Sequence, residues 1–313
     1  MARIIKPQAL KKGDTIAVVA PASPVPFAKL KLGVSRLKAA GFKVYVHPQC
    51  HKKNGYLAGN DKARAQALMS VFADDRFKAV VCARGGFGAI RLLKHLDFKL
   101  IKAHPKIFVG YSDITILHHA FLHSGFVTFH GAMPSIDLCR KNYKYNLQNF
   151  TRAVTSTKPL GDLENPKRLG KFEKYHSGKA SGILIGGNIS LLVKLIGTEF
   201  MPSFKNKIVM LEDTDEEPYR IDGYLGHLFN ATDIAKAAGF IIGEWVKVKV
   251  RRRNYPSLNL DEVIKHYFDG IKAPILTNVA CGHGKNVLTI PLGVRVFIDA
   301  DRKIFKIIEK AVV

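Results

Sequence analysis

Residues 107–129 read IFVGYSDITILHHAFLHSGFVTF and contain the order of elements that decides the fold. The apolar run 107–109 predicts a strand, and the glycine-containing turn after it leads into a helix from Ile114 to about His123. Residues 127–129 predict the next strand. A strand, a helix and a second strand connected this closely are typical of a parallel sheet with helices on both faces.

The same alternation extends toward the N-terminus. Short apolar runs predict strands at Ile16–Ala20, Val44–Val46 and Ala79–Cys82. Apolar residues at helical spacing predict a helix over Phe27–Ala40 and another that ends near Phe72, with Asn60 as the N-cap of the second. A further helix is expected around Ile90–Lys94, after a glycine turn. We therefore expect an N-terminal α/β domain over residues 1–150.

A polar, basic stretch that is broken by prolines and glycines follows this domain, and we expect a linker over residues 151–174. Alternating apolar runs resume at Gly182–Ile185 and continue to Ile304–Ile308. Within this part of the chain the pattern predicts a helix over Leu260–Phe268 and a strand over Val287–Ile290. Residues 175–313 are therefore expected to form a second domain.

The composition is that of a globular protein in a reducing compartment. Of the 313 residues 47% are hydrophobic, which excludes intrinsic disorder over most of the chain. The four cysteines lie far apart with no C-x-x-C, which argues against a disulfide scaffold or a zinc ribbon. No apolar run approaches the ~18 residues of a spanning helix. The run Ile16–Ala20 is also shorter than the ~7–15 apolar residues of a signal peptide, so we expect a cytoplasmic protein without a membrane partner.

The net charge is +24, from 49 Lys and Arg against 25 Asp and Glu. Such a charge fits nucleic acid, a membrane surface or anionic substrates as partners. The strongest basic patch, Lys247–Arg253, alternates basic and apolar residues as a half-exposed strand does. No helix-turn-helix, RNA-recognition or zinc-finger pattern accompanies this patch. A basic nucleic-acid-binding protein is therefore kept only as an alternative function.

The turn Gly110-Tyr111-Ser112-Asp113 is the sharpest local feature. A serine between a strand and a helix exposes its hydroxyl above the sheet edge, and the helix N-terminus directs backbone N–H groups toward a developing oxyanion. This is the arrangement of a nucleophile elbow, although Ile114 replaces the last glycine of G-x-S-x-G. The alternative is a serine that only caps the helix.

A second turn between a strand and a helix reads Arg84-Gly85-Gly86-Phe87-Gly88. Its glycines permit positive φ and a close approach of the backbone to a ligand. The turn lacks the Lys-Ser/Thr of a P-loop and the last glycine of G-x-G-x-x-G. An oxyanion-hole loop and a plain tight turn both remain open. Arg84 can hold a carboxylate bidentately or form a surface salt bridge.

Two further motifs supply an acid and a base. Leu211-Glu212-Asp213 ends an apolar strand, where open α/β sheets bind their ligands, but exposed loop carboxylates would give the same pattern. Gly282-His283-Gly284 gives a histidine the access that a general base needs, and a solvated loop histidine is the alternative.

Two weaker patterns are interpreted as coincidental. His119 and His123 have the i, i+4 spacing of metal ligands, but the glutamate of H-E-x-x-H is absent. Ser35 and Lys38 match S-x-x-K in the middle of a helix, with no K-T-G after them. We therefore expect neither a metal nor a cofactor.

Stretches that match one known family run nearly from end to end. They are Gly13–Pro24, Ala83–Gly88, Gly110–Thr115, Phe129–Gly131, Gly186–Asn188, Leu211–Asp213, Pro218–Asp222, Gly282–Gly284 and Leu288–Gly293. Together they resemble the LD-carboxypeptidases that recycle murein tetrapeptide and the related microcin C immunity peptidases. The resemblance implies an α/β chain with a flavodoxin-like N-terminal domain containing a parallel sheet, and a smaller β-rich α/β C-terminal domain.

The resemblance also implies a serine peptidase with a Ser–His–Glu triad. Ser112 corresponds to the nucleophile, His283 to the base and Glu212 to the acid that orients the base. The chain order serine, acid, histidine is also that of the α/β-hydrolases, whose elbow differs.

The resemblance assigns the oxyanion hole to the backbone N–H groups of Gly86 and Asp113, and a contact with the free carboxylate of the substrate to Arg84. Phe87 stands where the family often has tyrosine, so a ring hydroxyl contact is missing here. Lys285 follows the glycine–histidine motif where prolines are frequent, which affects the surroundings of the base.

The implied reaction is metal-independent hydrolysis of the L,D amide bond that releases the terminal D-Ala from murein tetrapeptide, a small peptide substrate of peptidoglycan recycling. A cytoplasmic homodimer is implied as well. The alternative within the family is an immunity-type peptidase that cleaves a peptidyl-nucleotide amide. A nucleobase needs an aromatic side chain to stack on, and Trp245 is the only tryptophan.

Overall fold

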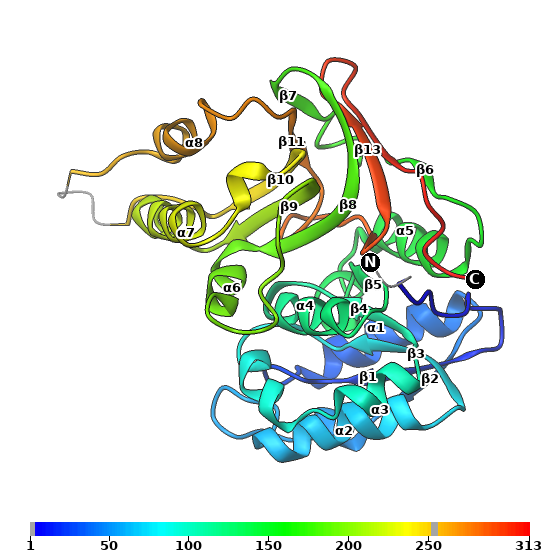
Figure 1. Cartoon of the computed structure of the whole chain (residues 1–313). Helices are drawn as coiled ribbons and strands as arrows, with labels where there is room; N and C mark the ends of the chain where they lie inside the picture. The colour runs from blue at the N-terminus through cyan, green and yellow to red at the C-terminus, as the bar shows by residue number, and fades with distance from the viewer. Residues whose placement is uncertain (1–3, 252–255) are drawn as a thin grey trace. The chain divides into compact units, whose positions relative to one another are not determined.

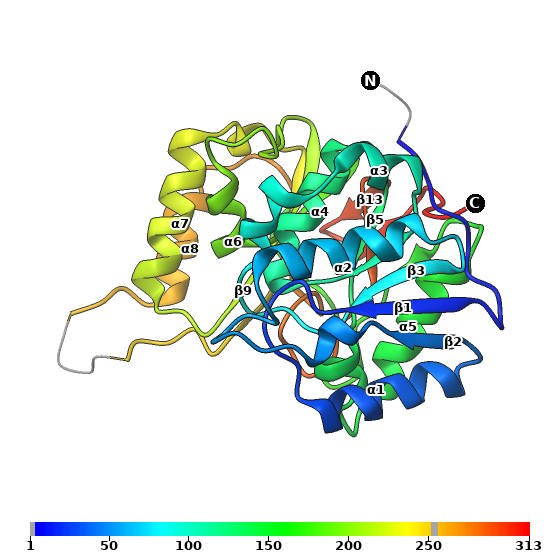
Figure 2. The ribbon, with the colours of Figure 1, turned by 90° about the horizontal axis from the view of Figure 1, so that it is seen from below.

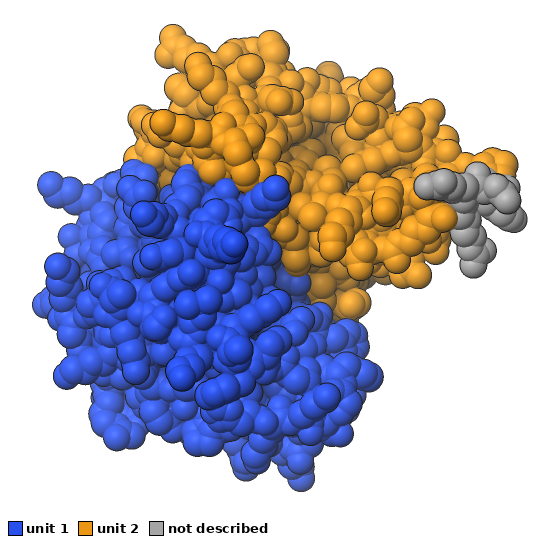
Figure 3. Space-filling view, turned by 180° about the vertical axis from the view of Figure 1, so that it is seen from behind, with its two compact units in different colours: residues 1–160, 285–294, 309–313 blue, residues 161–284, 295–308 orange. Residues whose placement is uncertain are grey.

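The structure is a computed structural model that describes residues 4–251 and 256–313. The chain forms two compact units, each with a sheet of its own (Figure 3). Unit 1 comprises residues 1–160, 285–294 and 309–313, and unit 2 comprises residues 161–284 and 295–308. No helix in the described part of the chain is both long and apolar enough to cross a membrane.

Unit 1 contains a six-stranded sheet. Its strands are β1 (Thr15–Val19), β2 (Lys43–Val46), β3 (Phe77–Cys82), β4 (Ile107–Gly110), β5 (Thr128–His130) and β12 (Ile290–Leu292). The spatial order is β12-β5-β4-β3-β1-β2, and every pair is parallel except β12 with β5. The order 2-1-3-4-5 of the parallel strands is that of flavodoxin, so the predicted flavodoxin-like parallel sheet is confirmed.

Helices cover both faces of this sheet, as Figure 2 shows, with α1 and α5 on one face and α2 and α4 on the other. The α-helices are α1 (Phe27–Ala39), α2 (Asp61–Ala73), α3 (Phe98–Ala103), α4 (Thr115–His123) and α5 (Tyr143–Thr155). Short 3₁₀ turns lie at Pro48–His51, Ala89–His95 and Ser112–Ile114, and a π-helical turn at Pro134–Leu138. The strands β1, β3 and β4 are mostly apolar because both of their faces are buried, whereas β2 is partly exposed.

Unit 2 contains an eight-stranded mixed sheet in the order β6-β14-β13-β8-β9-β10-β11-β7. Its strands are β6 (Gly161–Asp162), β7 (Glu173–His176), β8 (Lys179–Asn188), β9 (Lys207–Thr214), β10 (Gly239–Val246), β11 (Ile275–Val279), β13 (Arg295–Asp299) and β14 (Ile304–Ile307). The four central strands β8 to β11 are parallel, and the outer strands are antiparallel to their neighbours. Unit 2 is therefore the expected strand-rich α/β unit.

Three α-helices belong to unit 2, namely α6 (Ile189–Leu192), α7 (Pro218–Ala231) and α8 (Leu260–Phe268). The helices α7 and α8 pack side by side (Figure 1). A capping box between Asn259 and Glu262 starts α8 and satisfies two backbone donors that the helix leaves open. Short 3₁₀ turns lie at Val193–Leu195 and Ile234–Lys236.

Two local predictions differ from the structure. The helix expected around Ile90–Lys94 is a 3₁₀ helix, Ala89–His95, that follows Gly88 at a φ of 119°. The strand expected over Val287–Ile290 is β12, Ile290–Leu292, which pairs with β5 of unit 1.

Two of the helical glycines, Gly33 and Gly223, provide a matched test of packing. A Cβ on Gly33 of α1 would lie 2.8 Å from Pro134 Cα, whereas a Cβ on Gly223 of α7 would meet no atom within 4 Å. We predict that Gly33→Ala lowers the free energy of unfolding by about 1–3 kcal/mol through overpacking. Gly223→Ala should raise it by about 0.5–1 kcal/mol through helix propensity. Urea unfolding followed by circular dichroism measures both, and a stabilised Gly33→Ala would contradict the close packing.

Candidate active site

Ser112 lies in a strained turn at the carboxyl end of β4. Its φ is +66°, a left-handed conformation that costs a non-glycine residue about 1–2 kcal/mol. The strand ends at Gly110, and α4 begins at Thr115, three residues after the serine. The carbonyl of Gly110 accepts from the backbone N–H of Gly131 at 3.0 Å. Strain of this kind is held at functional turns by the structure around them, and here it presents a half-buried hydroxyl.

The loop after β3 approaches the Ser112 turn closely because the residue at the contact is a glycine, Gly85. A Cβ on Gly85 would lie 2.9 Å from Ser112 Cβ and 3.2 Å from Ser112 Oγ. Gly86 has a φ of +115° and is exposed, next to the buried Gly85. The glycines of the loop therefore bring a backbone segment against the serine.

The side chain of Asp113 joins the two turns. It is buried, and its Oδ2 accepts from the backbone N–H of Ala89 at 2.7 Å. An ionised acceptor makes a stronger hydrogen bond than a neutral one. The loop from 84 to 88 is therefore held at a fixed position relative to Ser112.

Arg84 belongs to the same loop. Its Nη1 donates to the carbonyl of Pro24 at 3.2 Å, and its Nη2 lies 3.7 Å from where a Cβ of Gly86 would be. Its Nε is buried and has no hydrogen-bond partner in the described part of the chain. Because a buried guanidinium N–H without a partner is costly, this arginine has unused capacity to donate.

Glu212 and His283 form a second cluster, in unit 2. Glu212 is wholly buried near the end of β9, and its Oε2 lies 2.8 Å from Nδ1 of His283, whose side chain is 18% exposed. A carboxylate beside Nδ1 assigns the proton to that nitrogen and leaves the lone pair on Nε2. The pair is therefore arranged as an oriented general base.

Glycines make this contact possible as well. A Cβ on Gly282, whose φ is +137°, would lie 2.7 Å from Glu212 Cδ, and a Cβ on Gly284 would lie 2.7 Å from Glu244 Cδ. A Cβ on Gly243 would lie 3.0 Å from Glu212 Cβ. Larger residues at these positions would push the histidine loop off the carboxylates.

Asp213, next to Glu212, is a second buried acid. It accepts from Nδ2 of Asn188 at 3.0 Å and from the backbone N–H groups of Ser190 at 2.9 Å and Thr214 at 2.7 Å. Burial, followed by the charge of Glu212, raises the pKa of Asp213 to about 6, against these hydrogen bonds, which lower it. The two carboxyls therefore occupy different environments, with Asp213 tied to β8 and α6.

A buried histidine lies behind the serine turn. Nε2 of His118 is 2.9 Å from the carbonyl of Gly110, and burial lowers its pKa to about 3. It is therefore neutral at physiological pH and acts as a hydrogen-bond partner of the turn. No sequence pattern singled it out.

Other sequence candidates lie apart from these clusters. Among the described residues, no three His, Cys, Asp or Glu side chains gather as metal ligands would. The patch Lys247–Arg253 falls partly outside the described residues. Its described part, residues 247–251, is not the half-exposed strand that the alternation predicts, because β10 ends at Val246 and Lys247 turns the chain at a φ of 58°. Ser35 donates to the carbonyl of Leu32 within α1.

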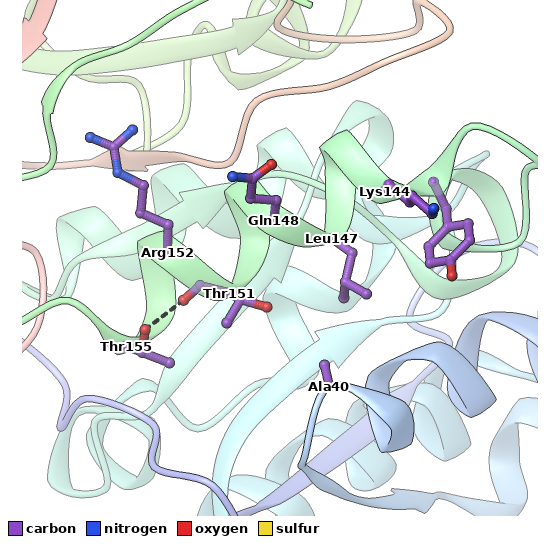
Figure 4. A pocket seen from close by; sticks show the side chains of 8 residues that line it. Ala40, Lys144, Leu147, Gln148, Thr151, Arg152 and Thr155 are labelled. Carbon is purple, nitrogen blue, oxygen red and sulfur yellow. Dashed lines mark hydrogen bonds between the residues drawn. The ribbon is translucent and has the colours of Figure 1, made fainter.

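One open pocket of unit 1 contains none of the predicted site residues. It has a volume of about 550 Å³ and is lined by Ala40 and by residues of α5. Figure 4 shows Leu147 pointing toward Ala40, whereas Gln148 and Arg152 point the opposite way. Most of its wall is the surface of α5.

A pocket of unit 2 lies closer to the acid–base pair. It has a volume of about 390 Å³, and its lining includes Gly243, Glu244 and Trp245 at the end of β10. In the sheet register Trp245 is opposite Asp213 of β9. The only tryptophan of the chain is thus paired with the residue that follows Glu212 in β9.

Family models match both halves of the chain. One, described as the LD-carboxypeptidase N-terminal domain, matches residues 16–131, and another, described as the LD-carboxypeptidase C-terminal domain, matches residues 181–298. A probable murein peptide carboxypeptidase of Bacillus subtilis is 38% identical over 308 residues, which cover 95% of this chain and 92% of that protein.

Solved structures are similar over the same length. A mutant of the microcin C7 self immunity protein in complex with adenosine monophosphate has a TM-score of 0.91 at 25% identity, covering 99% of this chain and 100% of that one. A muramoyltetrapeptide carboxypeptidase from Oxalobacter formigenes has a TM-score of 0.81 at 26% identity, covering 93% and 97%.

The raised pKa of Asp213 predicts a pH dependence of stability. The folded state holds this proton up to about pH 6, whereas an unfolded aspartate loses it near 3.9. The folded state therefore binds more protons between about pH 4 and 6, and the group destabilises the fold by up to about 3 kcal/mol as the pH rises through that window. Relative to the wild type, Asp213→Asn should gain stability from pH 4 to 7. Urea unfolding at each pH gives this difference, and parallel profiles would contradict the assignment.

Proposed function

This chain belongs to the LD-carboxypeptidase family of serine-type peptidases, and on that premise we propose that it releases the terminal D-Ala from murein tetrapeptide. The observation that carries the proposal is the buried Glu212 carboxylate 2.8 Å from Nδ1 of His283. A base oriented in this way is what an otherwise weak serine nucleophile requires.

The proposed reaction starts at Ser112. Its Oγ attacks the carbonyl carbon of the L,D amide bond while Nε2 of His283 takes the hydroxyl proton, and Glu212 stabilises the imidazolium. The proposal requires His283 of unit 2 to reach Ser112 of unit 1 in the working enzyme. The protonated histidine then gives its proton to the leaving amine of D-Ala, and water hydrolyses the acyl-enzyme by the same groups in reverse roles.

Backbone donors stabilise the tetrahedral intermediate in this proposal. The N–H groups of Gly86 and Asp113 are assigned to the oxyanion, because the glycine loop lies against Ser112 and Asp113 follows Ser112 in the 3₁₀ turn Ser112–Ile114. Arg84 is assigned to the terminal carboxylate of the substrate. Its buried Nε without a partner in the described part of the chain supports that role.

The peptide substrate is supported by the relatives, among them the murein peptide carboxypeptidase of Bacillus subtilis. Murein peptides carry several carboxylates, and a protein of net charge +24 attracts them. A cytoplasmic homodimer goes with the proposal by family resemblance.

A second candidate is the immunity-type cleavage of a peptidyl-nucleotide amide by the same groups. It is favoured by the position of Trp245, opposite Asp213 in the sheet and beside a pocket of about 390 Å³. A nucleobase stacks on such a ring. A structural relative, the microcin C7 self immunity protein, is described in complex with adenosine monophosphate.

We predict that Ser112→Ala lowers kcat on murein tetrapeptide by about 10⁴-fold or more, because the three side chains act as a unit. Mass spectrometry of the tetrapeptide after incubation detects the loss of one alanine. Ser70→Ala is the matched control, since its hydroxyl only donates to the carbonyl of Ala67 within α2. A chelator should leave the rate unchanged. Full turnover by Ser112→Ala would refute the triad, and strong inhibition by chelation would point to a metal.

Replacing Trp245 separates the two candidates. If its ring holds a nucleobase, Trp245→Ala lowers kcat/KM for a peptidyl-nucleotide by about 5–100-fold and leaves the tetrapeptide rate unchanged. Trp245→Phe retains a stacking surface and serves as the control. A wild-type enzyme that cleaves only the tetrapeptide, with no effect of either variant, would remove the support for the nucleotide substrate.

A further inference from the structure

Ser23, in the segment after β1, holds the loop that lies against Ser112. Its Oγ accepts from the backbone N–H of Phe87 at 3.1 Å, and its own N–H donates to the carbonyl of Gly85 at 3.4 Å. Ser23 is 9% exposed, and a Cβ on Gly86 would lie 2.6 Å from its Cβ. The residue therefore packs directly against the exposed peptide of Gly86.

The contact of the Ser23 N–H with the Gly85 carbonyl sets the orientation of the Gly85–Gly86 peptide group, and the Ser23 hydroxyl holds the next peptide group through the Phe87 N–H. The C=O and N–H of a trans peptide point in opposite directions. Because the carbonyl of Gly85 is directed toward Ser23, the N–H of Gly86 in the same peptide is directed away from Ser23. The N–H of Phe87, the next donor along the loop, is already occupied by the Ser23 hydroxyl.

The other side of the same loop faces the nucleophile. A Cβ on Gly85 would lie 3.2 Å from Ser112 Oγ, so the Gly85–Gly86 segment is placed between two serine side chains. The segment after β1 also receives Arg84, whose Nη1 donates to the carbonyl of Pro24. Three consecutive loop residues and the arginine before them are thus held by Ser23 and Pro24.

Ser23 and the glycine loop both lie at the ligand-binding edge of the parallel sheet. In the strand order 2-1-3-4-5 the chain reverses direction between β1 and β3, and ligands of such sheets bind where the strands end at that reversal. Ser23 follows β1, and the glycine loop follows β3. Ser23 and the glycine loop therefore meet at the position where sheets of this topology bind their ligands.

We propose that Ser23 is a positioning residue that selects the Gly86 N–H as the oxyanion donor and aims it at the reacting carbonyl. The inference rests on the proposed serine-peptidase function. Ser23 acts through the backbone: its hydroxyl fixes the Phe87 N–H, and its N–H fixes the Gly85 carbonyl. Such a residue changes the stability of the transition state and leaves ground-state binding nearly unchanged.

The test is Ser23→Ala, which removes one hydrogen bond and keeps the backbone contact. Loss of one such bond corresponds to about a tenfold change in rate. We expect kcat on murein tetrapeptide to fall about tenfold and KM to stay within about twofold. A peptide boronate, whose tetrahedral adduct on Ser112 places an oxygen in the hole, should bind about tenfold more weakly. Ser23→Cys, with a weaker acceptor, should give an intermediate loss, and Ser35→Ala is the control.

Each outcome decides between distinct possibilities. An unchanged kcat, or a raised KM with an unchanged kcat, would overturn the positioning role. A fall in melting temperature with unchanged kinetic constants per titrated active site would show a purely structural role and overturn it too. If the wild type cleaves no tetrapeptide, the proposed function fails. The rate at which a fluorophosphonate modifies Ser112, with and without Ser23→Ala, then still decides the inference, and equal rates would overturn it.

Discussion

The chemistry of unit 2 depends on one buried charge. Glu212 has no exposed surface, and a carboxylate removed from water is stable only beside an opposite charge or hydrogen-bond donors. His283 supplies that partner at 2.8 Å, and the charge of Glu212 also helps to keep the pKa of Asp213 near 6. The same contact that makes the burial tolerable fixes the tautomer of the histidine. One contact therefore both stabilises the buried Glu212 carboxylate and orients the His283 ring.

In both units, glycines allow polar groups to come into contact, because a larger residue would not fit at these positions. Gly85 lets a loop lie on Ser112, and Gly282 lets the histidine loop lie on Glu212, each at a distance that a Cβ would block. All of these residues lie at or just after the carboxyl ends of parallel strands, which is where open α/β sheets bind ligands. The strands provide fixed positions, and the glycines remove the bulk that would keep the groups apart.

The sequence predicts best what depends on local pattern. The helix Leu260–Phe268 has the expected bounds, and the buried strands of the parallel sheet are recognisable because both of their faces are apolar. The sequence predicts contacts between distant segments less well. The pairing of β12 with β5 has no local signal, and periodicity cannot show that His283 folds onto an acid 71 residues earlier. Family resemblance supplied that pair, and the role of Ser23 follows only from its contacts.

The net charge of +24 and the site residues act over different ranges. Exposed charges are screened beyond about 8 Å at physiological ionic strength, so they accelerate the encounter with an anionic peptide without orienting it. Arg84 differs, because its Nε is buried and its guanidinium lies beside Gly86, where screening is weaker. In the proposed reaction the surface collects carboxylates of any kind. In the same proposal Arg84 selects the terminal carboxylate, and the loop that carries Arg84 is held by Ser23 and Pro24.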